Sequence, residues 1–397
     1  MTHHEVLVIG GGTAGLSVAA ALRNRSDAPQ VTIIDPSEKH YYQPIWTLVG
    51  AGVFPKEVSE RNEADYIPDG ANWIKEKVAT FQPENNSITL TNGDQHTYDI
   101  LVVAAGIQID WDKIPGLKDN VGKPGTGICS NYSYETVDST WENIRNLKKG
   151  TAIFTHVSGP VKCGGAPMKI TFLASDYWRK HGLANQVKVK FIKAGGGIFD
   201  VPKYVQSLKN VAEKYNLDQT FNSDLIALNA DAKEATFKNL KSGEEWIEKY
   251  DMIHVTPPQS SPDFIKQSPI ANDAGWVEVD KYTAQHIKYP NIFSLGDCSS
   301  LPTSKTGAAI RKQVPVVVEN LMSYQKGNPI KKTYDGYTSC PVVTGYGSLI
   351  LAEFDYDKNP AESFPFDQSK ERYSMYALKA YGLPRLYWHG MLRGREF

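Results

Sequence analysis

The sequence predicts an α/β protein with two Rossmann-like domains and a C-terminal region, and three observations support this fold class. An apolar run at residues 6–9 leads into a glycine cluster and then into an Ala- and Leu-rich stretch that favours a helix. A second apolar run, residues 187–192, is followed by another glycine cluster. A third, residues 290–297, ends in Gly-Asp. Apolar runs that alternate with helical stretches are typical of parallel sheets.

The first glycine cluster has the spacing of a dinucleotide-binding turn. Gly10 permits the tight turn, Gly12 lets a pyrophosphate approach the backbone, and Gly15 lets the helix pack on the strand. The helix N-terminus points its N–H groups at the phosphates. Asp35 ends the next apolar run, residues 31–34, where an acid binds a ribose hydroxyl. The motif alone would also suit a tight turn in an ordinary α/β protein, but its context predicts a dinucleotide site.

The composition excludes several classes of protein. Of the 397 residues, 41% are hydrophobic and 22% are charged, which is ordinary for a globular protein. The net charge of −1 and the lack of a basic run among aromatics argue against nucleic acid as a partner. No apolar run is long enough to span a bilayer, and the first strand leaves no room for a signal peptide. We expect a protein of the cytoplasm or of the cytoplasmic face of a membrane.

The four cysteines lie far apart and form no Cys-x-x-Cys motif, which argues against a metal site or a disulfide scaffold. Cys163 and Cys340 both lie in loops rich in glycine and proline. From the residues alone, each reads either as a small buried hydrophobe or as half of a catalytic pair.

Several segments resemble the sulfide:quinone oxidoreductases, in particular the branch that includes the mitochondrial enzyme. They are the aromatic segment at 40–50, Val-Lys-Cys at 161–163, Tyr-Thr-Ser-Cys-Pro at 337–341, and residues 364–372. The resemblance covers essentially the whole chain. It implies a fold of the FAD/NAD(P)-linked reductase type, with FAD in the first domain.

The resemblance to two-dinucleotide flavoproteins implies further contacts with FAD. A short strand over residues 73–78 would end with main chain against the adenine, residues 98–106 would close over the flavin, and Asp297 would bind the ribityl chain. A helix capped by Thr303 or Ser304 would point at the pyrimidine edge, with Lys305 adding positive charge or remaining a solvated lysine. The expected FAD-binding residues are Gly10, Gly12, Thr13, Ala14, Gly15, Asp35, Gln43, Val78, Ala105, Gly106, Gly296, Asp297, Lys305 and Gly307.

The glycine cluster after residues 187–192 stands where we expect a second dinucleotide motif, and it is damaged. Gly195 and Gly197 keep the first two glycines, but Asp200 takes the place of the third and Pro202 follows. A carboxylate there repels a pyrophosphate. We expect a second Rossmann-like domain that has lost NAD(P)H.

By resemblance, Cys163 and Cys340 are the redox pair. Hydrosulfide would attack their disulfide, forming a persulfide on one cysteine and a thiolate on the other, in an order that the sequence leaves open. Lys162 is a candidate charge beside Cys163. A sulfide, sulfite or small thiol would remove the sulfur, and ubiquinone or menaquinone would take the electrons. The aromatics expected around the quinone are Phe364, Phe366, Tyr387 and Trp388.

Two cysteines and the C-terminal segment leave alternatives open. Cys129 would hold FAD covalently, assist sulfur transfer or do nothing, whereas Cys298 is expected to be a packed small residue. Residues 373–395 mix aromatic and basic side chains, which suits a helix in a lipid headgroup layer. The alternative is a helix packed on the protein or on a subunit partner.

We expect an FAD-binding domain from residues 1–110 and 280–328, a second Rossmann-like domain from 111–279, and a C-terminal region from 329–397. Two other functions share parts of this pattern: a type II NADH:quinone oxidoreductase, and the flavin subunit of a flavocytochrome-type sulfide dehydrogenase. Asp200 and the cysteine pair disfavour the first. The sequence leaves a homo-oligomer open.

Overall fold

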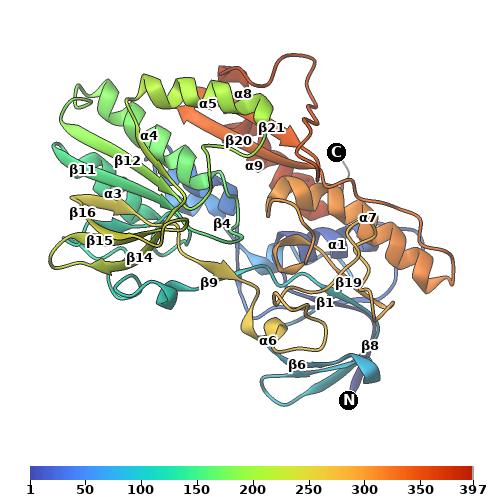
Figure 1. The fold of residues 1–397 in the computed structure, drawn as a ribbon. Helices are drawn as coiled ribbons and strands as arrows, with labels where there is room; N and C mark the ends of the chain where they lie inside the picture. The colour runs from blue at the N-terminus through green and yellow to red at the C-terminus, as the bar shows by residue number, and fades with distance from the viewer. Residues whose placement is uncertain (396–397) are drawn as a thin grey trace.

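The N-terminal apolar run forms β1 (Thr2–Ile9), the buried centre of the first sheet in a computed structural model that describes residues 1–395. The sheet has seven strands in the order β5-β2-β1-β8-β7-β6, with β19 paired to β8, and β1 runs parallel to both of its neighbours. The other strands are β2 (Val31–Ile34), β5 (Asn72–Ile74), β6 (Val78–Gln82), β7 (Ser87–Leu90), β8 (Gln95–Val103) and β19 (Ile292–Ser294). Helices α1 (Thr13–Arg23) and α7 (Gly307–Gln325) pack together beside this sheet (Figure 1).

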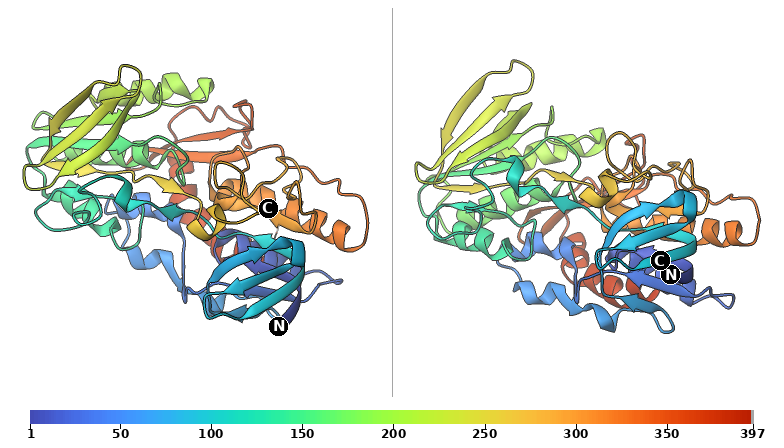
Figure 2. Two further views of the ribbon diagram at one scale, coloured as in Figure 1. Left: turned by 60° about the horizontal axis from the view of Figure 1, so that its bottom comes forward. Right: turned by 90° about the horizontal axis from the view of Figure 1, so that it is seen from below.

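A second, parallel sheet has the order β10-β17-β11-β12-β13. Its strands are β10 (Ile128–Cys129), β11 (Gly150–His156), β12 (Val187–Lys193), β13 (Asp218–Phe221) and β17 (Met252–His254). Its helices are α3 (Val137–Asn146), α4 (Ala166–Lys180) and α5 (Pro202–Lys214). An antiparallel sheet of β14 (Ser223–Asn229), β15 (Glu234–Asn239) and β16 (Glu245–Lys249) adjoins it (Figure 2). The structure confirms the predicted α/β class.

The parallel strands of the two sheets share one plan. β11 lies between β17 and β12, as β1 lies between β8 and β2. β11 is therefore the equivalent of β1, and the loop at residues 157–165 is the equivalent of the glycine turn. The prediction that Gly195, Gly197 and Asp200 occupy this position was wrong, because they follow the second strand, β12.

The C-terminal region contacts both halves of the molecule. β20 (Thr338–Gly345) pairs with β21 (Ser348–Phe354) and packs on α4, while α8 (Tyr373–Ala377) packs on β21. A π-helical turn (Leu378–Gly382), α9 (Leu383–His389) and a short 3-10 turn (Met391–Arg393) then bring the chain back to α1. Figure 1 shows β20 and β21 beside α4 and α5.

Burial corrects the expectation for some of the C-terminal aromatics, while Tyr373 and Tyr381 stay exposed. Tyr376, Tyr387, Trp388 and Leu392 are buried within the protein and do not face a lipid layer. They pack in the core shared with α1, because the segment folds back on the first domain. Among residues 1–395, no helix has the length and apolar character needed to cross a membrane.

Residues 73–78 do not form one strand. β5 ends at Ile74, a turn brings the Glu76 N–H to the Ile74 carbonyl, and Val78 begins β6. The remaining short strands and α-helices are β3 (Lys39–Tyr41), α2 (Trp46–Val49), β4 (Glu60–Asn62), β9 (Gln108–Ile109), β18 (Gln259–Ser260) and α6 (Asp263–Lys266). The domain limits given above stay a prediction.

Candidate functional site

The glycine turn after β1 leaves open space at the start of α1. Gly10 has a φ of +103°, and a Cβ on Gly15 would overlap the Gly10 carbonyl oxygen, so helix and turn pack directly on each other. A Cβ on Gly12 would meet no atom within 4 Å. No side chain caps α1, which leaves its first N–H groups for an anion.

Asp35 lies beside this turn, as predicted from the spacing. Its Oδ2 accepts a hydrogen bond from the Gly11 N–H at 2.6 Å, and its Oδ1 accepts one from the Ser37 N–H at 2.7 Å. Gly106 has a φ of +72° and, like Gly307, would carry a Cβ into empty space. These residues fit a dinucleotide, because no side chain covers the backbone where the phosphates and the flavin ring would approach.

Lys305 holds the Gly-Asp turn and does not project into solvent. Its Nζ donates to the Asp297 carbonyl at 2.5 Å and to the Ser299 carbonyl at 3.3 Å. Gly296, Asp297 and Lys305 line one small cavity, and burial raises the pKa of Asp297 and lowers that of Lys305.

The cap of α7 differs from the prediction. Thr306 Oγ1 accepts a hydrogen bond from the Ala309 N–H at 3.1 Å, and α7 begins at Gly307. Thr303 instead donates to the Gly336 carbonyl, and Ser304 lies before the cap position.

Lys162 points away from the cysteines. Its Nζ donates to Gln43 Oε1 at 2.8 Å and lies 5.2 Å from the centre of the Trp46 ring. Burial lowers its pKa to about 8. The prediction that Lys162 supplies the charge beside Cys163 was therefore wrong, although Lys162 does tie the cysteine loop to the expected flavin residue Gln43.

Cys163 and Cys340 meet although 176 residues separate them in the sequence. Their thiols hydrogen-bond to each other, and a Cβ on Gly165 would overlap the Cys340 sulfur. The Cys163 N–H donates to the Lys305 carbonyl at 2.9 Å, next to the start of α7. The pair thus lies against the turn that is expected to hold the flavin.

Lys169 supplies the charge that the sequence analysis placed on Lys162. Its Nζ, on a side chain that is 1% exposed, donates to Cys163 Sγ at 3.1 Å. The hydrogen bond with Cys340 and the charge of Lys169 hold the pKa of Cys163 well below its ordinary value, whereas the bond with Cys163 and burial raise that of Cys340. The sequence contained one signal for Lys169, since it is the only charged residue between Cys163 and Asp176.

A second buried lysine lies near the pair. Lys379 is 4% exposed, its Nζ donates to the Pro44 carbonyl at 3.0 Å, and burial together with the charge of Lys169 lowers its pKa to about 7. No signal in the sequence pointed to Lys379, because it lies in the segment that was expected to face lipid.

The other two cysteines are packed in the core. Cys129 is fully buried, its thiol donates to the Ile253 carbonyl at 3.6 Å, and burial raises its pKa to about 12. Cys298 is equally buried, and its thiol donates to the Val103 carbonyl at 3.5 Å. The prediction for Cys298 is confirmed, and the packing of Cys129 favours the alternative without a chemical role.

The four aromatics expected around a quinone form two separate pairs. Phe364 and Phe366 stack with ring centres 5.3 Å apart, and both are partly exposed. Tyr387 and Trp388 are buried against His40 and each other. Within the described chain, no ring contact joins the two pairs.

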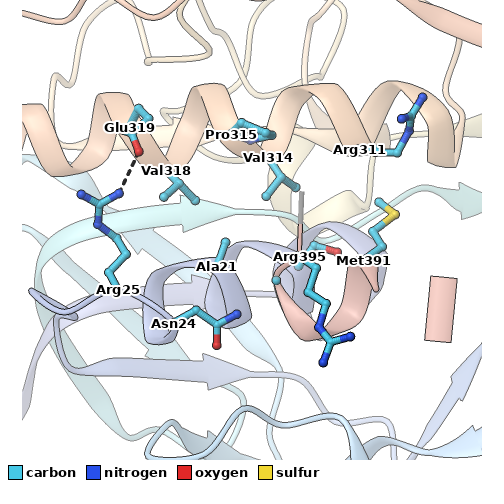
Figure 3. Close-up of a pocket in the computed structure, with 12 residues that line it drawn as sticks. Ala21, Asn24, Arg25, Arg311, Val314, Pro315, Val318, Glu319, Met391 and Arg395 are labelled. Atoms are coloured by element: carbon cyan, nitrogen blue, oxygen red, sulfur yellow. Dashed lines mark hydrogen bonds and ion pairs between the residues drawn. The ribbon is translucent and has the colours of Figure 1, made fainter. Parts of the chain in front are cut away.

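A cavity of about 150 Å³ lies elsewhere, between α1, α7 and the C-terminal turn (Figure 3). An ion pair between Arg25 and Glu319, with an N–O distance of 2.7 Å, crosses it. None of its described lining residues is among the expected site residues. Residues 1–395 also contain no cluster of three His, Cys, Asp or Glu side chains that would hold a metal ion.

Comparison with known proteins shows the family of this chain. Residues 4–315 match the family model described as pyridine nucleotide-disulphide oxidoreductase. The mitochondrial sulfide:quinone oxidoreductase of Dictyostelium discoideum is 49% identical over 99% of this chain and 87% of that protein. The sulfide:quinone oxidoreductase structure from Aquifex aeolicus matches 100% of this chain and 92% of its own with a TM-score of 0.85 at 20% identity, which supports the fold.

The type II NADH:quinone oxidoreductase of Staphylococcus aureus is a distant relative, 24% identical over 81% of this chain and 83% of that protein. The family match over most of the chain and the near full-length identity both lead to one conclusion. The chain belongs to the sulfide:quinone oxidoreductases of the pyridine nucleotide-disulphide oxidoreductase family.

Proposed function

We propose that this chain is an FAD enzyme that oxidises hydrogen sulfide at Cys163 and Cys340 and reduces a membrane quinone. The observation that carries the proposal is the meeting of these two sulfurs beside the buried ammonium of Lys169 and against the turn at Lys305. A pair of inert core cysteines needs neither the cation nor this location.

FAD is the flavin that the residues fit. The open backbone at Gly12 and the uncapped start of α1 suit its pyrophosphate, Asp35 suits its adenosine ribose, and Gly106 leaves room beside the ring. When bound, FAD would accept an electron pair from the thiol site and pass it to the quinone.

The charges at the two thiols support one order of the sulfur steps. In the oxidised pair, hydrosulfide attacks the sulfur of Cys340, the Cys163–Cys340 bond breaks, and Cys163 leaves as a thiolate. A thiol of lower pKa is the better leaving group, and Lys169 stabilises the negative charge on Cys163. Cys340 then carries the added sulfur as a persulfide, until a second sulfide, a sulfite or a small thiol removes it.

The second sheet supports the loss of NAD(P)H. The loop equivalent to the glycine turn carries Cys163, so a thiol stands in the region that phosphates need. In the glycine cluster after β12, Lys193 packs next to Gly195 and its Nζ lies 3.9 Å from Asp200. We therefore do not favour the NADH:quinone reaction.

The quinone is a lipid-soluble substrate, so we propose that the protein works at a membrane surface, on the cytoplasmic or matrix side. Of the four aromatics considered for its ring, the partly exposed Phe364 and Phe366 remain candidates. Tyr387 and Trp388 are used in internal packing.

The test is an anaerobic titration of the flavin absorbance with sulfide, followed by quinone. We expect sulfide to bleach the flavin, NADH to leave it oxidised, and quinone to restore it. Cys163→Ser and Cys340→Ser should keep the flavin and show no bleaching, whereas the control Cys298→Ser should behave as the parent. Bleaching by sulfide in both serine variants would rule out the proposed mechanism.

A further inference from the structure

A buried chain of hydrogen bonds connects the C-terminal segment to the glycine turn, and the proposed sulfur chemistry does not use it. Thr13 Oγ1 lies 2.7 Å from the Tyr387 hydroxyl, which lies 2.5 Å from His40 Nε2. His40 Nδ1 lies 3.0 Å from Glu63 Oε2. His40, Glu63 and Tyr387 are each less than 5% exposed.

The protons of this chain can be assigned in one consistent order. Thr13 donates to the Tyr387 oxygen, Tyr387 gives its single proton to His40 Nε2, and His40 donates from Nδ1 to Glu63. In this order every member of the chain has a hydrogen-bond partner, and Glu63 Oε2 is the acceptor at its end. One atom remains: Glu63 Oε1 makes no hydrogen bond with any residue of 1–395.

The free oxygen of Glu63 lies at the glycine turn. A Cβ placed on Gly11 would overlap Glu63 Oε1 and lie 3.1 Å from the Cβ of Asp35, so the two carboxylate side chains flank the same point. A buried carboxylate oxygen without a donor is costly, which makes a donor from a ligand the natural partner. A ribose diol supplies two neighbouring O–H donors.

We propose that Glu63 is a second ribose-binding carboxylate: its Oε1 accepts a hydrogen bond from one hydroxyl of the adenosine ribose, and Asp35 accepts one from the other. His40 and Tyr387 are positioning residues that hold Glu63 in place. The retention of the cofactor thereby depends on the C-terminal segment. This inference rests on the proposed FAD site.

The experiment measures the dissociation constant of FAD by flavin fluorescence, for the parent and for Glu63→Gln. A second ligand, an FAD analogue whose adenosine lacks both ribose hydroxyls, separates a ribose contact from a structural effect. We expect Glu63→Gln to weaken FAD about tenfold or more and to weaken the analogue much less. Glu38→Gln is the matched control, because Glu38 is an exposed carboxylate near the same turn, paired with Lys75.

Tyr387→Phe tests the positioning role. It should weaken FAD less than Glu63→Gln, and the double variant should be no weaker than Glu63→Gln alone, because Tyr387 acts through Glu63. Equal losses for FAD and for the analogue in Glu63→Gln, or no loss, would overturn the ribose contact while leaving the FAD site intact. A parent chain that binds no FAD would overturn both proposals.

Discussion

The loops after β1 and β11 occupy equivalent places in the two larger sheets, but they differ in their side chains. After β1, Gly12 leaves the backbone bare at the start of α1. After β11, Cys163 and Lys169 put a thiol and an ammonium at the start of α4. Both loops use glycine for close approach: Gly15 admits the Gly10 carbonyl, and Gly165 admits the Cys340 sulfur. The strand-to-helix position is shared, and the side chains decide its chemistry.

The largest effect is expected from the glycine that packs the first loop. In Gly15→Ala, the new methyl group overlaps the Gly10 carbonyl oxygen, so turn and helix must separate. Overpacking of this kind costs about 3 kcal/mol. We expect a lower melting temperature and almost no bound flavin, measured by thermal unfolding and by the flavin absorbance of the purified protein.

Gly12→Ala is the matched variant in the same loop. Its Cβ meets no protein atom, so the melting temperature of the flavin-free protein should stay unchanged while flavin affinity falls. If Gly12→Ala bound flavin as the parent does, the proposed approach of the pyrophosphate to this loop would be wrong.

The first loop was predictable because its proposed function depends on missing side chains. Gly10, Gly12 and Gly15 have their roles through backbone geometry, which spacing reveals, and Asp35 follows at the expected strand end. The apolar run at residues 31–34, which forms β2, had an equally local signal.

The second loop was not predictable in the same way. Its glycines do not have the spacing of a dinucleotide-binding motif. The motif was therefore assigned to Gly195 and Gly197, which follow the next strand. The choice between Lys162 and Lys169 depends on side-chain direction. Lys162 and Cys163 are neighbours whose side chains point to different sides, whereas Lys169 lies on α4 and its ammonium contacts the Cys163 sulfur. The C-terminal aromatics had a pattern that suits lipid and protein cores alike, and only tertiary packing decided between them.

An intermediate effect is expected from the glycine of the second loop. In Gly165→Ala, the methyl group overlaps the Cys340 sulfur and moves the two thiols apart. A displacement of about 1 Å can cost about 100-fold in rate. We expect sulfide-dependent flavin reduction in stopped flow to slow by that order, with normal flavin content. Gly164→Ala, whose Cβ meets no atom within 4 Å, should match the parent, and an equal loss in both variants would show a general disturbance of the loop.

The smallest effect is expected from removal of the positive charge beside Cys163. Lys169→Met removes the ammonium that, together with the Cys340 thiol, lowers the pKa of Cys163. That pKa should rise, so less thiolate is present near neutral pH, and the acidic limb of the pH profile for alkylation of the reduced protein should move to higher pH. A hydrogen bond to a charged group is worth about 1.5–3 kcal/mol, so the alkylation rate near neutral pH should fall about tenfold or more. Lys162→Met is the control, because the Lys162 ammonium binds Gln43 and should leave this limb in place. If the acidic limb moved in Lys162→Met and stayed in place in Lys169→Met, Lys162 would be the residue that lowers the pKa of Cys163.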